Sequence, residues 1–161
     1  MNTDNLITVE ELAGRLKMAT EGVKKKSGLM KSTVGYMEMV YKYVDRIATA
    51  KEQGRLVATH GTQQPLEIYE AMDVVGVFNE FWGVISDLVG MPESVPEALS
   101  IAASTGTPLE VCSFFRNMDG LLHAGKWPHT DVFLYATSSC DNVKAFHTLG
   151  RRYGIPDFGM E

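Results

Sequence analysis

The sequence has 161 residues, of which 45% are hydrophobic and 22% are charged, and its formal net charge is −5 at pH 7. This length is sufficient for one packed core. No apolar run approaches the roughly 20 residues of a membrane-spanning helix, and the N-terminus is polar and acidic where a secretory signal would be basic and then apolar. We therefore expect a cytoplasmic protein with no membrane partner. The acidic balance also argues against nucleic acid as a partner.

The first third of the chain has the pattern of two helices. Thr8 and Glu11 have the spacing of a capping box at the start of a helix over residues 8–22. A second, longer helix is predicted over residues 32–54, ending at a glycine. Its apolar stripe consists of Val34, Met37, Val40, Tyr41, Val44 and Ile47. Residues 1–53 are therefore interpreted as a helical N-terminal segment.

From residue 54 onward, strand-like and helix-like runs alternate. Strands are predicted over 55–61, 74–79 and 131–138, with a further strand beginning near 155. The helices between and after them cover 64–73, 80–90, 94–106, 107–125 and 140–154. Capping boxes are predicted for Ser94 with Glu97 and for Thr107 with Glu110. Crossovers of this length join parallel strands, so residues 54–161 are predicted to form an α/β domain with a parallel sheet of about four strands flanked by helices.

The two cysteines are the main candidates for chemistry. Cys140 falls where a predicted strand gives way to the last helix, at the edge where parallel sheets place functional groups and where a helix N-terminus stabilises a thiolate. Cys112 lies about one turn inside the predicted helix 107–125 and either fills the core or converges with Cys140. Their spacing matches no zinc or ferredoxin pattern, and two thiolates are too few for a closed metal site. Further ligands would come from another chain, solvent or nearby residues: Asp141, His129 and His147.

Other chemical motifs are sparse. The sequence contains no glycine-rich phosphate loop and no GxSxG nucleophile elbow, so a self-contained nucleotide-binding enzyme is not expected. Glu67 lies three residues after Gln64, the predicted N-cap of the helix 64–73. Its carboxylate is either part of a capping box or part of an active site, and the spacing alone leaves both open.

A set of linked features gives the chain a family resemblance over roughly residues 33–158. The segments that carry it are "AKEQGRLVATHGTQQPLEIYEAMDVVGVFNEFW", "TPLEVCSFFRNMDGLL" and "DVFLYATSSCDNVKAFHTLGRRYGIPDF". The matching positions, in chain order, are Pro65, Glu67, Ala71, Met72, Glu80, Cys112 and Cys140. In their order and spacing these segments resemble the benzoyl-CoA reductase/2-hydroxyglutaryl-CoA dehydratase family, specifically its 2-hydroxyacyl-CoA dehydratase D-component-like proteins.

The resemblance implies radical chemistry on CoA thioesters. Family members are two-subunit enzymes in which each subunit holds an iron–sulfur cluster, commonly [4Fe-4S], on three cysteines. An ATP-dependent activator protein with its own iron–sulfur cluster supplies single electrons, which either drive dehydration of a 2-hydroxyacyl-CoA or reduce an aromatic acyl-CoA ring. By this resemblance Cys112 and Cys140 are metal ligands and Glu67 is catalytic. The substrate-binding positions would be Thr62, Gln63, Gln64 and Glu80.

The third cysteine ligand of the family has no counterpart among the two cysteines of this sequence. Family subunits are longer and carry it on a second α/β domain, so the resemblance is to the N-terminal domain alone. We expect a chain that is inactive by itself, binds a cluster weakly or not at all, and holds the Cys112 and Cys140 sulfurs roughly 6 to 7 Å apart in one cavity. The alternative is a non-catalytic α/β interaction module, or a degenerate family member without a cluster, in which both cysteines are buried packing residues.

Overall fold

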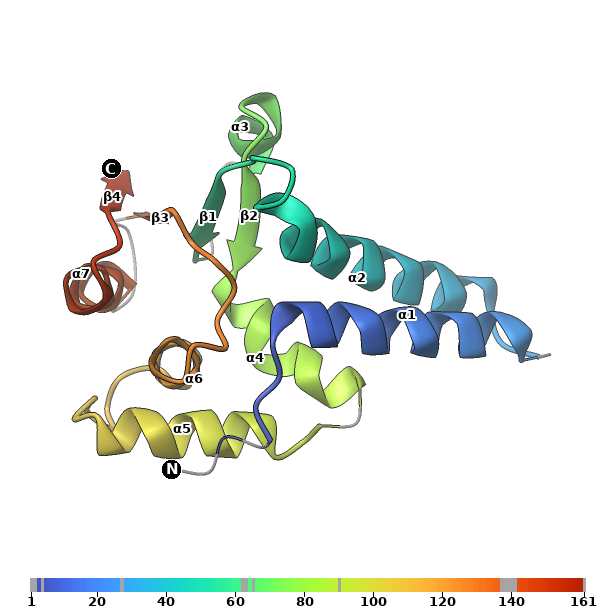
Figure 1. Cartoon of the computed structure of the whole chain (residues 1–161), viewed down its shortest axis with the longest axis horizontal. Coiled ribbons are helices and arrows are strands. Elements are labelled where there is room, and N and C mark those ends of the chain that lie inside the picture. The colour runs from blue at the N-terminus through green and yellow to red at the C-terminus, as the bar shows by residue number, and fades with distance from the viewer. Residues whose placement is uncertain are drawn as a thin grey trace.

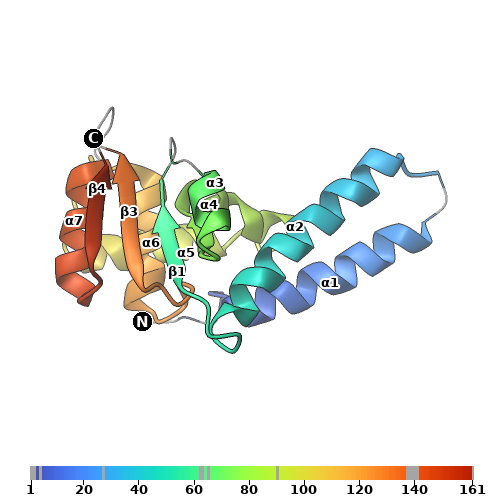
Figure 2. The same cartoon turned by 90° about the horizontal axis from the view of Figure 1, so that it is seen from above.

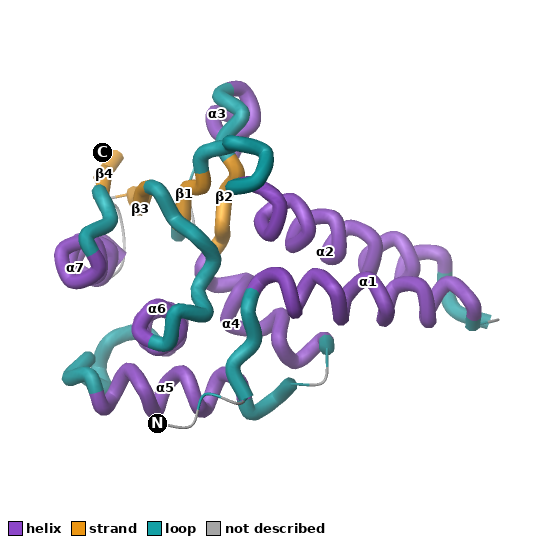
Figure 3. Tube along the Cα trace, in the orientation of Figure 1, coloured by secondary structure: helices purple, strands orange, loops and turns teal. Residues whose placement is uncertain are grey.

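The structure is a computed structural model that describes residues 3, 5–26, 28–61, 64, 66–89, 91–136 and 142–160. Its elements are shown in Figures 1 and 3 and run in the order α1 (Val9–Lys25), α2 (Lys31–Ala50), β1 (Val57–His60), α3 (Leu66–Ala71), β2 (Val75–Phe78), α4 (Asn79–Leu88), α5 (Ser94–Ser104), α6 (Ser113–His123), β3 (Val132–Ala136), α7 (Asn142–Tyr153) and β4 (Asp157–Met160). The strands form one parallel sheet in the order β2-β1-β3-β4. The predicted α/β class, with a helical N-terminal segment, is confirmed.

Helices α1 and α2 form a hairpin that projects from one end of the sheet (Figures 1 and 2). The predicted capping box is present: Thr8 Oγ1 accepts from Glu11 N at 3.2 Å, and the Glu11 carboxylate accepts from Thr8 N at 2.9 Å. Such a cap contributes about 1 kcal/mol. The buried stripes of the hairpin comprise Leu12, Leu16, Val40, Val44 and Ile47, and they belong to the same apolar core as the sheet. Among the described residues no helix is long and apolar enough to cross a membrane.

One face of the sheet is filled by helices. Because paired residues of parallel strands point to the same side, one face carries Val57, Thr59, Val75, Val77, Phe133 and Tyr135, all buried. Helices α4, α6 and α7 lie on this face, with α5 beyond α6 (Figure 1). Phe146 of α7 contacts the rings of Phe115, Phe133 and Tyr135 at centroid distances of 4.9, 5.3 and 5.9 Å. We call this side the covered face.

The opposite face, which we call the open face, is partly covered by α3, and α2 lies along its β2 edge. Figure 2 looks onto it, with β1, β3 and β4 lying in front of α5, α6 and α7. Its side chains include Ala58, His60, Phe78, Val132 and Leu134. Parallel sheets are normally buried on both faces. Here Phe158, which pairs with Leu134 in register, is 66% exposed.

Two predicted capping boxes are wrong. Helix α5 begins at Ser94 with Glu93 as its N-cap, and the Glu97 carboxylate accepts a hydrogen bond from Asn5 instead of turning back to Ser94. Helix α6 begins at Ser113 rather than near residue 107. The physical reason at the second site is that the Thr107 hydroxyl donates to a carboxylate of α6, described below, rather than to a helix terminus. Cys112 is therefore the N-cap residue of α6 and does not lie inside it.

Candidate functional site

Parallel strands end at a common edge, where the following loops and helices bring polar groups together. At this edge β1 ends at His60 and is followed by Gly61 and Gln64, and β2 ends at Phe78 and is followed by Asn79 and Glu80. The chain between β3 and α7 lies outside the described residues. The described part of the edge is therefore built by β1, β2 and the starts of α3 and α4.

His60 is the most enclosed titratable side chain at this edge, with 4% of its surface exposed. Its ring stacks on Phe78 at a centroid distance of 5.6 Å and 13° between planes, and it also contacts the Tyr69 ring at 5.3 Å. Nδ1 lies 2.9 Å from the Gly61 carbonyl oxygen. Burial lowers the pKa of His60 below its ordinary value, which the hydrogen bond to Gly61 partly opposes. The imidazole is therefore held neutral at pH 7.

A cavity of about 520 Å³ opens beside His60, between α2, α3 and the β2 edge of the sheet. We call it the His60 cavity. Its lining consists of Met39, Val40, Tyr43, Arg46, His60, Gly61, Gln64, Leu66, Tyr69, Glu70, Val75, Gly76, Phe78 and Phe81. Gly76 forms part of its floor, where an added Cβ would lie 3.0 Å from His60 Nε2. The glycine thus leaves the space next to this nitrogen open.

Two tyrosines fix the walls of the His60 cavity. The Tyr43 hydroxyl accepts a hydrogen bond from the backbone N–H of Phe78 at 2.8 Å, and burial raises the pKa of Tyr43 to about 12. The Tyr69 hydroxyl donates to Gln64 Oε1 at 3.1 Å, and burial raises the pKa of Tyr69 to about 12. Both phenols are therefore neutral at pH 7, and each ties a helix to the sheet edge.

Several buried polar atoms near this edge have no partner among the described residues. Gln64 Nε2 and Arg46 Nε are buried in side chains that line the His60 cavity. Asn79 is fully buried at the first position of α4, and neither Oδ1 nor Nδ2 has a hydrogen-bond partner. Most buried polar groups in folded proteins are hydrogen-bonded. Arg55 Nε and Ser86 Oγ, which lie elsewhere, are also unpaired within the described ranges, so only the unpaired groups that line the His60 cavity bear on a ligand.

Cys112 lies at another part of the molecule, at the N-terminal end of α6. Its thiol is free and its side chain is exposed, so the interpretation of Cys112 as a buried packing residue is wrong. The N-terminal halves of α6 and α7 pack against each other, because Phe115, the third residue of α6, and Phe146, the fifth residue of α7, lie edge to face at a centroid distance of 4.9 Å. In the sequence, Cys140 precedes the first residue of α7 by two positions, but it lies outside the described residues.

The remaining predicted site residues fall in different surroundings. Gln64 lines the His60 cavity. Glu67 is exposed in the first turn of α3, and Glu80 is half-buried in the first turn of α4. Neither carboxylate has a polar partner among the described residues, so Glu67 does not serve as a capping-box carboxylate for its own helix. Thr62 and Gln63 lie outside the described residues.

The two histidines considered as further ligands are paired with aspartates. His129 Nε2 lies 3.0 Å from Asp131 Oδ1, just before β3 begins, which is the opposite edge of the sheet from the strand ends. His147 Nδ1 lies 3.1 Å from Asp157 Oδ2, and the His147 side chain is 53% exposed. His129 is therefore remote from the candidate edge. The third candidate, Asp141, lies outside the described residues.

The donor set of the chain does not complete an iron–sulfur site. Within the described ranges, no three His, Cys, Asp or Glu side chains converge as metal ligands. The sequence contains two cysteines, and a cubane bound by three cysteines needs one thiolate more. A [4Fe-4S] cluster on this chain would therefore require a ligand from outside it.

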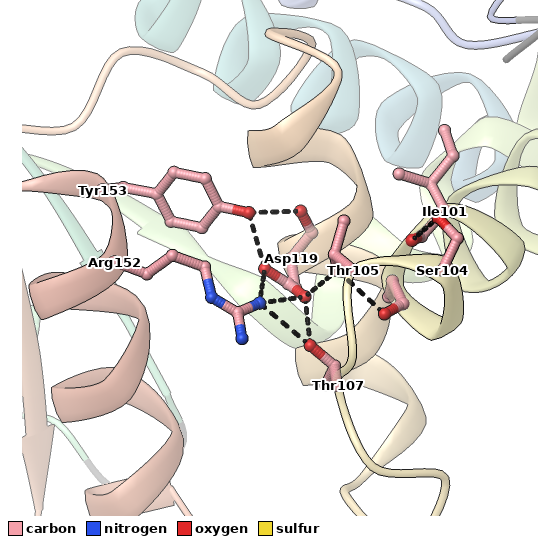
Figure 4. A network of polar contacts seen from close by, with 8 residues as sticks. Ile101, Ser104, Thr105, Thr107, Asp119, Arg152 and Tyr153 are labelled. Carbon is pink, nitrogen blue, oxygen red and sulfur yellow. Dashed lines mark hydrogen bonds and ion pairs between the residues drawn. The ribbon is translucent and has the colours of Figure 1, made fainter.

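A second polar group, which we call the Asp119 network, joins α5, α6 and α7 (Figure 4). Asp119 is fully buried, and both of its oxygens accept hydrogen bonds. Oδ1 accepts from Tyr153 at 2.7 Å and from Arg152 at 3.0 Å, while Oδ2 accepts from Arg152 at 2.9 Å and from the hydroxyls of Thr105 and Thr107. Burial raises the pKa of Tyr153, and the adjacent carboxylate adds to the rise. This fully paired network fixes three helices relative to one another.

Sequence reasoning did not identify His60, Asn79 or the Asp119 network as notable. A signal was present for His60, since a histidine just before the final glycine of the predicted strand 55–61 falls at the edge where parallel sheets place functional groups. No comparable signal was present for Asn79, whose burial depends on the packing of α4.

No family model matches the sequence, and no curated protein matches it.

Proposed function

We propose that this chain is the N-terminal, iron–sulfur-cluster-bearing domain of a 2-hydroxyacyl-CoA dehydratase or benzoyl-CoA reductase-like subunit. The observation that carries the proposal is the packing of the N-terminal half of α6 against the N-terminal half of α7, because each cysteine of the sequence stands at or just before one of these helices. Unpaired N–H groups at two adjacent helix N-termini favour an anionic group such as a thiolate-held cluster. The exposed position of Cys112 leaves its sulfur accessible to such a group.

In this proposal Cys112 and Cys140 supply two of the three cluster thiolates, and the family's second α/β domain supplies the third. The cluster, when bound, would provide single electrons of low potential. Four residues of this chain would bind the CoA thioester through hydrogen bonds: Thr62, Gln63, Gln64 and Glu80. Glu67 would transfer a proton to or from the substrate. Glu67 suits this role because its carboxylate is exposed and free of other polar partners among the described residues.

The proposed partners are those that the family resemblance implies. They are a second homologous subunit, an ATP-dependent activator protein with its own iron–sulfur cluster, and the CoA thioester substrate. We place the protein in the cytoplasm, where two free thiols stay reduced. The chain is expected to be inactive without these partners.

The test is anaerobic reconstitution with iron and sulfide, read by iron analysis and visible absorption. The protein to test is this chain joined to a second α/β domain of the family, with the chain alone run in parallel. A stable cluster is expected in the joined protein, lost in Cys112→Ala and in Cys140→Ala but kept in the neighbouring control Ser113→Ala. Failure of the joined protein to take up iron, or full iron content in both cysteine variants, would contradict the proposal.

A non-catalytic interaction module is the second candidate, and the open face of the sheet favours it. That side of the molecule exposes large apolar side chains, which are Leu66, Ile68, Met72 and Phe158. Exposed apolar patches of this kind mark interaction surfaces. This candidate predicts no iron uptake by either protein in the reconstitution test, so the same experiment separates the two functions.

A further inference from the structure

The walls of the His60 cavity favour a planar, apolar ligand. Four aromatic rings line it, those of Tyr43, Tyr69, Phe78 and Phe81, together with the imidazole of His60. Aromatic rings attract another ring through stacked and edge-to-face contacts. The volume of about 520 Å³ lies within the range of small-molecule sites. A ligand of one or two rings therefore fits the cavity in size and in surface chemistry.

The tautomer of His60 decides which polar group it can recognise. A carbonyl oxygen can only accept, so the 2.9 Å contact between Nδ1 and Gly61 O places the proton on Nδ1. In the neutral ring Nε2 then carries a lone pair and can only accept a hydrogen bond. Nε2 lies above the bare backbone of Gly76 at the cavity floor and has no hydrogen-bond partner among the described residues. It is therefore free to accept a hydrogen bond from a ligand in the cavity.

The charges around the cavity favour a neutral molecule. Its charged lining residues are Arg46 and Glu70, and these bind each other through two hydrogen bonds of 2.5 and 2.8 Å. Neither charge is therefore free to balance an ionised ligand. Only one of the two polar atoms of the Gln64 amide is hydrogen-bonded among the described residues: Oε1 accepts from Tyr69, and Nε2 has no partner there. Gln64 Nε2 is itself buried, so the polar atom that remains for a neutral ligand is the acceptor His60 Nε2.

We propose that the His60 cavity binds a neutral aromatic compound with a hydroxyl group, whose O–H donates to His60 Nε2. A hydroxyl group can donate a hydrogen bond, so it pairs with a ring nitrogen that can only accept one. The inference is independent of the cluster proposal, because the cavity lies between α2, α3 and β2, whereas α6 and α7 lie on the covered face.

The test uses the full chain, labelled with ¹⁵N, and phenol and 4-methylphenol as probes. Saturable shifts are expected at the amides of β1, α3 and β2, and the His60 Nε2 resonance should move as it accepts a hydrogen bond. Anisole has the same ring without the donor, and it should bind about tenfold more weakly, the factor for one lost hydrogen bond. Benzoate carries a charge and should not bind. Equal binding of phenol and anisole, or no saturable binding of phenol, would overturn the proposal.

Two variants test whether phenol binds in the His60 cavity. His60→Phe keeps a ring on Phe78 and Tyr69 but removes Nε2, and it should weaken phenol binding about tenfold. Gly76→Ala retains the imidazole but puts a methyl group 3.0 Å from Nε2, so it should block the site. The matched control is His123→Phe, an exposed position at the end of α6, which should bind phenol like the wild type. Unchanged phenol affinity in both cavity variants, with native amide spectra, would overturn the proposal.

Discussion

The Asp119 network and the His60 cavity differ in how their buried polar groups are paired. On the covered face, the carboxylate of Asp119 is fully buried and each oxygen accepts at least two hydrogen bonds. On the open face, His60 is also buried, but its Nε2 and the neighbouring Gln64 Nε2 have no partner among the described residues. The first group is closed on itself, and the second stands beside a cavity of about 520 Å³.

This contrast distinguishes a polar network that stabilises the fold from polar groups that are available to a ligand. A buried network whose members all find partners within the protein stabilises one arrangement and leaves nothing for a ligand. An unpaired buried group has a free-energy cost that a ligand can remove. The comparison therefore predicts that substitutions in the Asp119 network lower stability, whereas substitutions at His60 act mainly on protonation and binding.

The largest expected effect is from Asp119→Ala. It removes the acceptor of four side chains and leaves the Arg152 guanidinium without its partner, so the free energy of unfolding should fall by about 3–5 kcal/mol. Urea denaturation followed by circular dichroism measures it. The control Glu110→Ala changes an exposed carboxylate that lines the neighbouring pocket and should shift stability by about 0.5 kcal/mol or less. A loss of less than about 1 kcal/mol in the free energy of unfolding for Asp119→Ala would contradict a structural role for the network.

Gly120→Ala tests the packing of α6 on α5 beside that network. A Cβ at Gly120 would lie 1.9 Å from the backbone oxygen of Ala98, so the helices must separate. We expect a loss of about 2–3 kcal/mol in the free energy of unfolding. The matched control is Gly14→Ala, an exposed position of α1 with nothing within 4 Å, which should stabilise by about 0.5–1 kcal/mol. If both variants gain stability, the close approach of α5 and α6 is wrong.

The smallest of the three effects is the pH dependence at His60. Its pKa is lowered in the folded protein by burial, so as pH falls below about 6.5 the unfolded chain binds a proton that the folded protein resists. The stability contributed by neutral His60 is therefore complete above that pH and is lost on the acid side. His60→Phe should flatten the acid-side fall in the free energy of unfolding, measured by urea titrations from about pH 8 to 5. His123→Phe serves as the control, and identical slopes for the wild type and His60→Phe would contradict the burial of a neutral imidazole.

The sequence predicted the order and type of the elements because periodicity and crossover length are local properties. The parallel sheet, the Thr8 capping box and the burial of Val40, Val44 and Ile47 all followed from short-range patterns. The start of α6 did not follow from such a local pattern. The Thr107 hydroxyl binds Asp119 and Arg152, which are distant in the sequence, and such tertiary hydrogen bonds override a local capping pattern.

The candidate site was predicted only in part, for a related reason. Gln64 was placed at the correct sheet edge because it follows a strand, and the structure puts it in the His60 cavity. His60 was missed because its free nitrogen depends on Gly76 and Phe78 of the neighbouring strand, and no pattern within one strand reveals these contacts. The thiol of Cys112 was expected near other ligands, and the structure places it, exposed, at the N-cap of α6.

The central claim, that Cys112 and Cys140 face a common site, can be tested directly by thiol cross-linking in this chain. The reagent is dibromobimane, which becomes fluorescent only when both of its arms have reacted with thiols, and mass spectrometry identifies the linked peptides. We expect one intramolecular link between Cys112 and Cys140 in the reduced native protein, absent in urea and absent from Cys112→Ser and Cys140→Ser. Two separately alkylated thiols in the native protein, with no link between them, would contradict the claim.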